Sequence, residues 1–236
     1  MEVSLSWSGW PEMARPPGER SHPRRRAGEI LARLRKEYPA AVTALRHENP
    51  YQLLVATILS AQCTDERVNS VTPGLFRQYP DAVALASARP AELETAIRST
   101  GFFRMKARNL IACSAALVER HEGRVPDVME ALVALPGVGR KTANVVLGQA
   151  FGIASGVVVD THVHRLAQRL GLSGADTPER IEADLMSLFD RGDWIGVGST
   201  LILHGRATCA ARTPKCDRCV VADLCPSAPD FLSRRP

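Results

Sequence analysis

The chain has 236 residues, enough for one large domain or two modest ones with a real hydrophobic core. Its composition, 45% hydrophobic and 23% charged, is typical of a globular protein. There is no run of about 18 apolar residues and no secretory signal pattern, so we expect neither a membrane span nor export and place the protein in the cytoplasm. The net charge of +5 suits a polyanionic partner but is weak evidence by itself.

The N-terminal stretch is rich in proline and arginine. With the triplet Arg-Arg-Arg at 24–26, it predicts a flexible basic tail over residues 1–26. Met13 is a second candidate start of the native protein.

Apolar spacing and capping residues predict helices over most of the remaining chain. Asn49, followed by a proline, opens a segment over 51–61 that is apolar nearly all round and should be buried. Asp127 and Asp160 are further candidate caps, and the only extended run is 156–159. Further helices are expected at 65–79 with an interruption at Pro73, and at 81–87, 90–98, 104–121, 161–170, 178–189 and 193–207. These patterns predict a nearly all-α protein.

The heptapeptide Leu-Pro-Gly-Val-Gly-Arg-Lys at 135–141 is the most informative stretch. Gly137 and Gly139 have no side chains to block approach, so the amides of this turn can meet a phosphate oxygen. A helix follows, and its N-terminus favours the same negative charge. Lys141 is therefore one turn from a predicted phosphate anchor. Taken alone, Gly-x-Gly is more typical of an ordinary connection between helices.

Four of the six cysteines are clustered near the C-terminus, with gaps of six, two and five residues between them. Thiolates are soft ligands, so this loop-rich segment predicts either a zinc site or an iron–sulfur cluster. Only one Cys-x2-Cys pair is present, which favours the cluster modestly. Cys63 and Cys113 lie in helical segments and are expected to be core residues. The candidate metal ligands are Cys209, Cys216, Cys219 and Cys225.

Five motifs together make the chain resemble the endonuclease III family, bifunctional DNA glycosylases of the helix–hairpin–helix superfamily. The resemblance covers about residues 28–226. The motifs are Leu-Ser-Ala-Gln-Cys-Thr-Asp at 59–65, Leu-Pro-Gly-Val-Gly-Arg-Lys-Thr-Ala-Asn-Val-Val at 135–146, Val-Asp-Thr-His at 159–162, Leu-Ile-Leu-His-Gly-Arg at 201–206 and the cysteine tail.

The resemblance implies an all-α, two-lobed helix–hairpin–helix glycosylase fold with a C-terminal iron–sulfur cluster loop. One lobe is a six-helix barrel over 43–154, and it ends in the hairpin. The other joins 27–42 to 155–229 and holds a [4Fe–4S] cluster rather than zinc. Residues 230–236 would form a short tail.

The family's activity implies a role for two residues. Lys141 matches the nucleophile, whose amine attacks the sugar C1′ of a damaged nucleotide and forms a Schiff base before β-elimination nicks the strand. The amine must be neutral to attack, and the helix N-terminus and Arg140 should disfavour its charged form. Asp160 matches the catalytic carboxylate that stabilises the cationic sugar. Its alternative role is that of a helix cap, and the role of His162 stays open.

The resemblance also implies contacts with double-stranded DNA that contains damaged bases or abasic sites. Gln62 would fill the gap left by the extruded nucleotide, although a glutamine in a turn is the simpler interpretation. Phe102 stands where relatives place an apolar wedge, often a leucine, or is a core residue. The remaining candidate contacts are Gly137, Val138, Gly139, Arg140, Arg212 and Lys215.

Three rival interpretations remain. A mismatch adenine glycosylase shares the hairpin and the cysteine spacing, but carries serine where Lys141 stands and extends through a further domain. A noncatalytic hairpin scaffold would bind DNA without needing Lys141 and Asp160. A zinc-stabilised regulator would lack visible absorbance.

We expect a monomer, associated with the nucleoid, that acts on oxidised pyrimidines.

Overall fold

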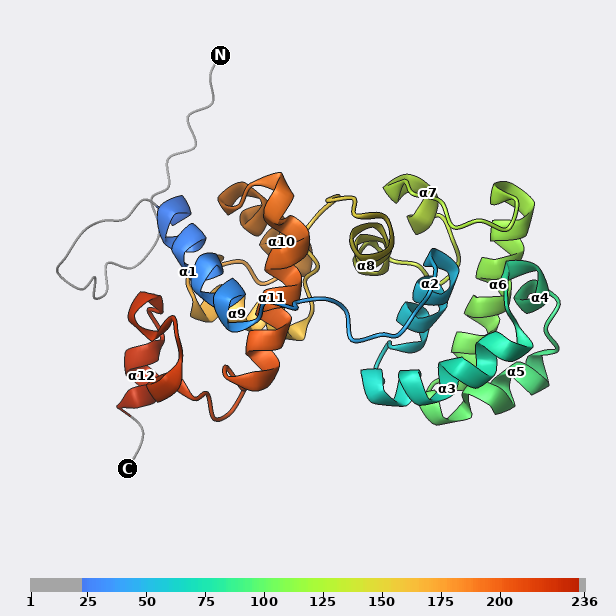
Figure 1. Ribbon diagram of the computed structural model, residues 1–236, viewed down its shortest axis with the longest axis horizontal. Helices are drawn as coiled ribbons and strands as arrows, with labels where there is room; N and C mark the ends of the chain where they lie inside the picture. Colours follow the sequence, from blue (N-terminus) through green and yellow to red (C-terminus); the bar gives the residue numbers. More distant parts are fainter. Residues whose placement is uncertain (1–22, 234–236) are drawn as a thin grey trace, which may run out of the picture.

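The computed structural model describes residues 23–233, and within them every regular element is helical (Figure 1). This confirms the all-α prediction. The α-helices are α1 (Pro23–Glu37), α2 (Pro50–Leu59), α3 (Asp65–Gln78), α4 (Ala82–Ala86), α5 (Pro90–Ile97), α6 (Phe103–His121), α7 (Met129–Val133), α8 (Arg140–Phe151), α9 (Thr161–Arg169), α10 (Pro178–Leu188), α11 (Trp194–Ala207) and α12 (Ala228–Leu232). The 3-10 turns are η1 (Arg98–Thr100), η2 (Arg191–Asp193), η3 (Cys216–Arg218) and η4 (Ala222–Leu224).

The helices form two lobes, each around its own apolar core (Figure 1). Helices α2 to α8 surround the first core, which contains buried residues from Leu45 to Leu147. Helix α1 packs with α9, α10 and α11 around the second, which joins residues 27–34 to residues 157–221. The chain therefore crosses between the lobes twice, once after α1 and once after α8.

Helix α2 forms the centre of the first lobe. Asn49 caps it, since its side-chain oxygen accepts a hydrogen bond of 2.9 Å from the amide of Gln52. Most of its residues are buried, as its apolar sequence predicts. Helix α3 differs from expectation, because it continues through Pro73 without interruption. The φ of proline is compatible with a helix, and burial of Val68 and Leu75 on either side offsets the lost hydrogen bond.

Both chain ends are more ordered than the predicted tails. Helix α1 already begins at Pro23, so residues 23–26 are helical, and Arg26 donates hydrogen bonds to the carbonyls of Leu170, Gly171 and Leu224. These contacts hold the start of α1 against the second lobe. Likewise, α12 covers part of the stretch predicted as a C-terminal tail. The rest of the N-terminal tail, with Met13, lies outside the described residues.

Two local predictions need correction. Asp127 does not cap α7, which begins after Val128 without a side-chain cap. The run at 156–159 is an irregular connection that forms no strand. The helix expected over 193–207 is confirmed: α11 begins directly after Asp193, whose carboxylate pairs with Arg35 at 2.7 Å.

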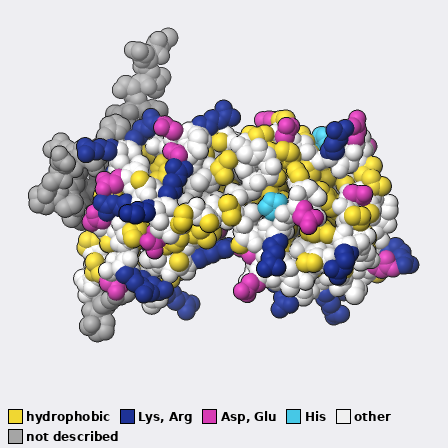
Figure 2. All heavy atoms as spheres, in the orientation of Figure 1, with side chains coloured by type: hydrophobic (Ala, Val, Ile, Leu, Met, Phe, Trp, Pro, Cys, Tyr) yellow, Lys and Arg dark blue, Asp and Glu magenta, His cyan; other side chains and the backbone are white. Residues whose placement is uncertain are grey.

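The described part of the chain contains no helix long and apolar enough to cross a bilayer. Lysine and arginine side chains are spread over both lobes on the face seen in Figure 2, with acidic side chains between them. No single basic patch therefore marks a surface for a polyanionic partner in this view.

Candidate active site

The hairpin consists of α7, a tight turn and α8. Gly137 has a φ of +77°, and a Cβ built there would lie 2.8 Å from the Cβ of Asn109, so the turn requires glycine on two grounds. Val138 is buried and fixes the turn to the core, which leaves only its backbone available to a ligand. Gly139 precedes α8 and provides no side-chain cap. The first amides of α8 are therefore free to bind an anion.

Lys141 is the second residue of α8, and its side chain is exposed. Within residues 23–233 its amine takes part in no hydrogen bond or ion pair. The chain contains three other lysines, Lys36, Lys106 and Lys215. Lys106 and Lys215 use their amines to bind backbone carbonyls, and Lys36 is at the far end of α1 in the other lobe. Lys141 is thus the one lysine at the hairpin with a free amine.

The neighbouring Arg140 forms an ion pair within the protein. Its guanidinium donates hydrogen bonds of 2.8 and 3.0 Å to the two carboxylate oxygens of Glu182 on α10, and this carboxylate raises the pKa of Arg140. Asn144 donates to the same carboxylate at 2.8 Å and accepts from Ser155 at 2.8 Å. Arg140, predicted as a DNA contact, therefore joins the hairpin helix to the second lobe.

Asp160 caps α9, as the sequence predicts. One of its oxygens, Oδ1, accepts hydrogen bonds from the amides of His162 and Val163 at 2.8 and 2.9 Å. Its side chain is only half-buried, so the second oxygen, Oδ2, remains available for chemistry. The cap fixes the carboxylate at the start of α9, directly after the connection that leaves the hairpin lobe.

A neighbouring arginine, which was not predicted from the sequence, connects this region to the cysteine loop. Arg165 on α9 donates to the carbonyls of Gly205 and Cys209 at 3.0 and 2.9 Å, and it contacts the Nδ1 of His162 at 3.2 Å. His162 therefore lies between the start of α9 and the cysteine-bearing segment.

Gln62 and Phe102 occupy the turns after α2 and η1. Both have a left-handed backbone, with φ of +53° and +48°, and both side chains are exposed. Phe102 is 58% exposed, which excludes the alternative that it is a core residue. An exposed aromatic on a strained turn suits insertion into a ligand.

The four clustered cysteines line one cavity beside α9 and α11. No three His, Cys, Asp or Glu side chains of residues 23–233 converge as they would on a single metal ion. Burial raises the pKa of Cys219 to about 11, so a bound metal would supply the positive charge that keeps the Cys219 sulfur deprotonated. The donor set and its shared cavity fit an iron–sulfur cluster. Cys113 is a buried core residue and Cys63 packs partly buried against the same core, as expected.

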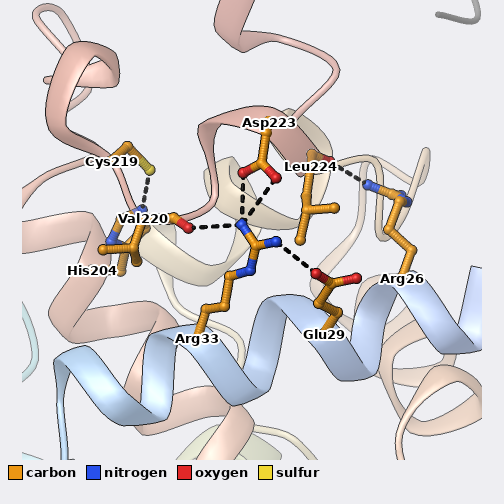
Figure 3. Close-up of polar contacts among 8 residues, drawn as sticks. All are labelled: Arg26, Glu29, Arg33, His204, Cys219, Val220, Asp223 and Leu224. Carbon is orange, nitrogen blue, oxygen red and sulfur yellow. Dashed lines mark hydrogen bonds and ion pairs between the residues drawn. The ribbon is translucent and has the colours of Figure 1, made fainter.

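Helix α1 holds the cysteine loop from outside (Figure 3). Arg33 donates to both carboxylate oxygens of Asp223 at 2.7 and 2.9 Å and to the carbonyl of Val220 at 3.2 Å. In the same view the Nε2 of His204 lies 3.5 Å from the Sγ of Cys219. These contacts fix the loop between its third and fourth cysteines.

Two basic residues of the first cysteine gap were predicted to contact phosphates. Arg212 is exposed. Lys215 is half-buried and donates to the carbonyl of Ala207 at 3.0 Å, so its amine helps to fix the loop on the end of α11. Of the two predicted phosphate contacts, Arg212 is therefore the one with the more exposed side chain.

Residues 55–191 match the HhH-GPD superfamily of base excision DNA repair proteins, and residues 209–225 match the iron–sulfur binding domain of endonuclease III. Endonuclease III of Synechocystis is 59% identical over 205 residues, which cover 87% of this chain and 94% of the relative. Endonuclease III of Escherichia coli K12 is 41% identical, covering 84% and 93% of the two chains.

The structure also resembles a solved trapped endonuclease III–DNA covalent intermediate, with a TM-score of 0.85 and 39% identity, covering 89% of this chain and 98% of that one. A thermostable thymine-DNA glycosylase, 21% identical with a TM-score of 0.80, shares the fold. The cofactor is therefore the [4Fe–4S] cluster expected from the sequence. The chain belongs to the endonuclease III family, and it is a DNA-binding base excision repair enzyme with glycosylase and abasic-site lyase activities.

Proposed function

We propose that this enzyme removes oxidised pyrimidines from duplex DNA and that Lys141 is its nucleophile. The observation that carries the proposal is the free Lys141 amine at the uncapped start of α8, next to turn amides that suit a phosphate. A structural neighbour trapped as a covalent intermediate with DNA supports it.

The proposed reaction starts with extrusion of the damaged nucleotide, which costs a few kcal/mol and least at a damaged pair. The neutral amine of Lys141 attacks C1′ as the glycosidic bond breaks, and the base leaves with the bonding electrons and takes up a proton. The sugar ring opens to a protonated Schiff base. Loss of a C2′ proton then expels the 3′ phosphate by β-elimination, and water releases Lys141 from the nicked product.

Asp160 is the proposed electrostatic partner in this sequence. Because Oδ1 is fixed by the amides of α9, Oδ2 is held in place to stabilise positive charge on the sugar and to take part in proton transfer. The helix cap thus orients the catalytic carboxylate, and the two roles considered for this residue are compatible.

The remaining contacts divide between phosphates and bases. We assign the backbone of residues 137–139 and the side chain of Arg212 to phosphate binding, with Lys215 supporting the loop that carries Arg212. Gln62 and Phe102 are assigned to the space vacated by the extruded nucleotide. The four cysteines hold the cluster, whose proposed role is to shape the loop. The protein is proposed to act as a monomer at the nucleoid.

Borohydride trapping tests the assignment of the nucleophile. Reduction of the Schiff base should link the wild-type protein covalently to a duplex that contains thymine glycol. Lys141→Gln should abolish the adduct while leaving affinity for that duplex largely intact, and the exposed Lys36→Gln serves as the matched control. An adduct formed by the Lys141 variant would show that another amine is the nucleophile. A wild-type protein that binds and never cross-links would favour the noncatalytic scaffold.

A further inference from the structure

Lys106 is a buried lysine that the proposed mechanism does not use. It lies on the first turns of α6 and is 2% exposed, although lysine is among the residues least often buried. Its amine donates a hydrogen bond of 2.8 Å to the carbonyl of Leu59 and one of 2.7 Å to the carbonyl of Thr100.

These two carbonyls belong to the two turns that carry the proposed DNA-inserting residues. Leu59 is the last residue of α2, three positions before Gln62, and Thr100 is the last of η1, two positions before Phe102. The backbone amide of Lys106 also donates to the carbonyl of Phe102 at 3.0 Å. A single residue therefore bonds to both sides of the Phe102 turn and to the base of the Gln62 turn.

Both turns need such support because their backbones are strained. Gln62 and Phe102 are two of only three non-glycine residues with positive φ among residues 23–233. A left-handed conformation costs an L-residue free energy and persists only where surrounding contacts impose it. The contacts of Lys106 act just where each turn begins.

The surroundings of the amine also argue against a purely space-filling role. No carboxylate among the described residues pairs with Lys106, so the ammonium is held by carbonyls at the C-terminal ends of α2 and η1, where the partial charge is negative. Burial lowers the pKa of Lys106. An apolar side chain of similar length would fill the same space without this desolvation cost.

We infer that Lys106 is a positioning residue that couples the Gln62 and Phe102 turns, so that the two side chains enter the duplex at a fixed separation. This inference rests on the proposed insertion of Gln62 and Phe102 into DNA. The inference predicts different effects on base excision and on nicking of an abasic site. Removal of a paired base requires extrusion and gap filling, whereas an abasic sugar has no base to unstack.

Single-turnover excision of thymine glycol from a duplex is to be compared with nicking of a preformed abasic site. Lys106→Met keeps the side-chain length and removes the amine. We expect excision to fall about 10- to 100-fold, since small misplacements at a site have effects of that size, and nicking to fall far less. The matched control is Leu117→Val, a buried change on the same helix away from both turns, which should leave the ratio of the two rates unchanged.

An equal fall of both rates in Lys106→Met would overturn the inference and leave the proposed function standing. A wild-type protein that processes neither substrate would overturn the proposed function itself. If Lys106→Met does not fold, Lys106→Gln replaces it, since its amide can still donate to one carbonyl, and a smaller change in the same ratio is expected.

A double-mutant cycle tests the coupling, first with Lys106 intact and then in a Lys106 variant. Gln62→Ala and Phe102→Ala should affect excision in a non-multiplicative way in the wild-type background, because one residue holds both turns. In the Lys106→Gln background the two effects should become multiplicative. Independent effects in the wild-type background would overturn the inference.

Discussion

Arg140 and Glu182 form a two-pronged ion pair that joins α8 to α10 across the two lobes, at 2.8 and 3.0 Å. The Glu182 side chain is 8% exposed and that of Arg140 is 49% exposed. The pair therefore places the start of the hairpin helix, and with it Lys141, relative to the lobe that carries Asp160. It fixes the geometry of a site assembled from two separate cores.

Glu182→Gln should weaken this connection. Removing one partner of a fully buried pair costs about 3–5 kcal/mol, but Arg140 is half exposed and can be hydrated, so we expect a loss of roughly 1–3 kcal/mol in the free energy of unfolding. Urea denaturation measures it, with the exposed Glu179→Gln on the same helix as control. A Glu182 variant as stable as the control would show that the lobes are held together elsewhere.

Gly156→Ala should also lower the free energy of unfolding, since its added Cβ would lie 1.9 Å from the Oε1 of Glu182.

Substitutions at Asp160 should separate capping from catalysis. Asparagine is as good a cap as aspartate, so Asp160→Asn should keep its stability but lose about 10²–10⁴-fold in excision rate if the carboxylate takes part in proton transfer. Asp160→Ala should lose the activity and also about 1 kcal/mol of stability. Thermal unfolding and single-turnover kinetics measure the two effects. Full activity in Asp160→Asn would reduce the residue to a helix cap.

Arg212→Gln should change the salt dependence of DNA binding. Each phosphate contact adds about one to the slope of log affinity against log salt, so loss of this exposed arginine should lower the slope by about one. Titrations at several salt concentrations give the slope. Arg120→Gln, at the end of α6, is the control and should leave it unchanged. An unaltered slope in the Arg212 variant would remove this residue from the interface.

Cys219→Ser should remove or weaken the cluster, because a hydroxyl is a poor replacement for a soft thiolate ligand. Iron content and visible absorbance should fall, and the loop over 209–225 should become sensitive to limited proteolysis. Cys113→Ser changes a buried core thiol and should retain full iron content. A colourless wild-type protein that contains zinc after anaerobic purification would contradict the assigned cofactor.

The sequence predicted those features whose signal is local. Asn49 and Asp160 cap helices where the pattern of residue types predicts caps, and Gly137 lies in a turn whose positive φ requires glycine. The interruption predicted at Pro73 was wrong, because tertiary packing overrides the local tendency of proline to end a helix. The resemblance identified the family, which the comparisons confirm, whereas the individual catalytic roles stay predictions.

Residues that act across the fold gave no such signal. In the sequence Glu182 resembles any polar residue of α10, but in the structure it is buried and accepts hydrogen bonds from Arg140 and Asn144. Lys106 and Arg165 bind carbonyls far away in sequence, and carbonyls carry no sequence signature. The partners of such side chains are set by how helices pack, so only the three-dimensional arrangement reveals them.

The packing of α1 against later segments of the chain has a consequence for folding during translation. Helix α1 leaves the ribosome before the other described helices, yet among residues 23–233 its apolar face, with Ile30 and Leu34, packs against segments that follow α8. The lobe of α2 to α8 is continuous in the chain, and as the earlier complete unit it is expected to fold first during translation. The apolar face of the nascent α1 therefore stays uncovered until α9 to α11 have been made, so the lobe that carries the cysteines closes after the other one.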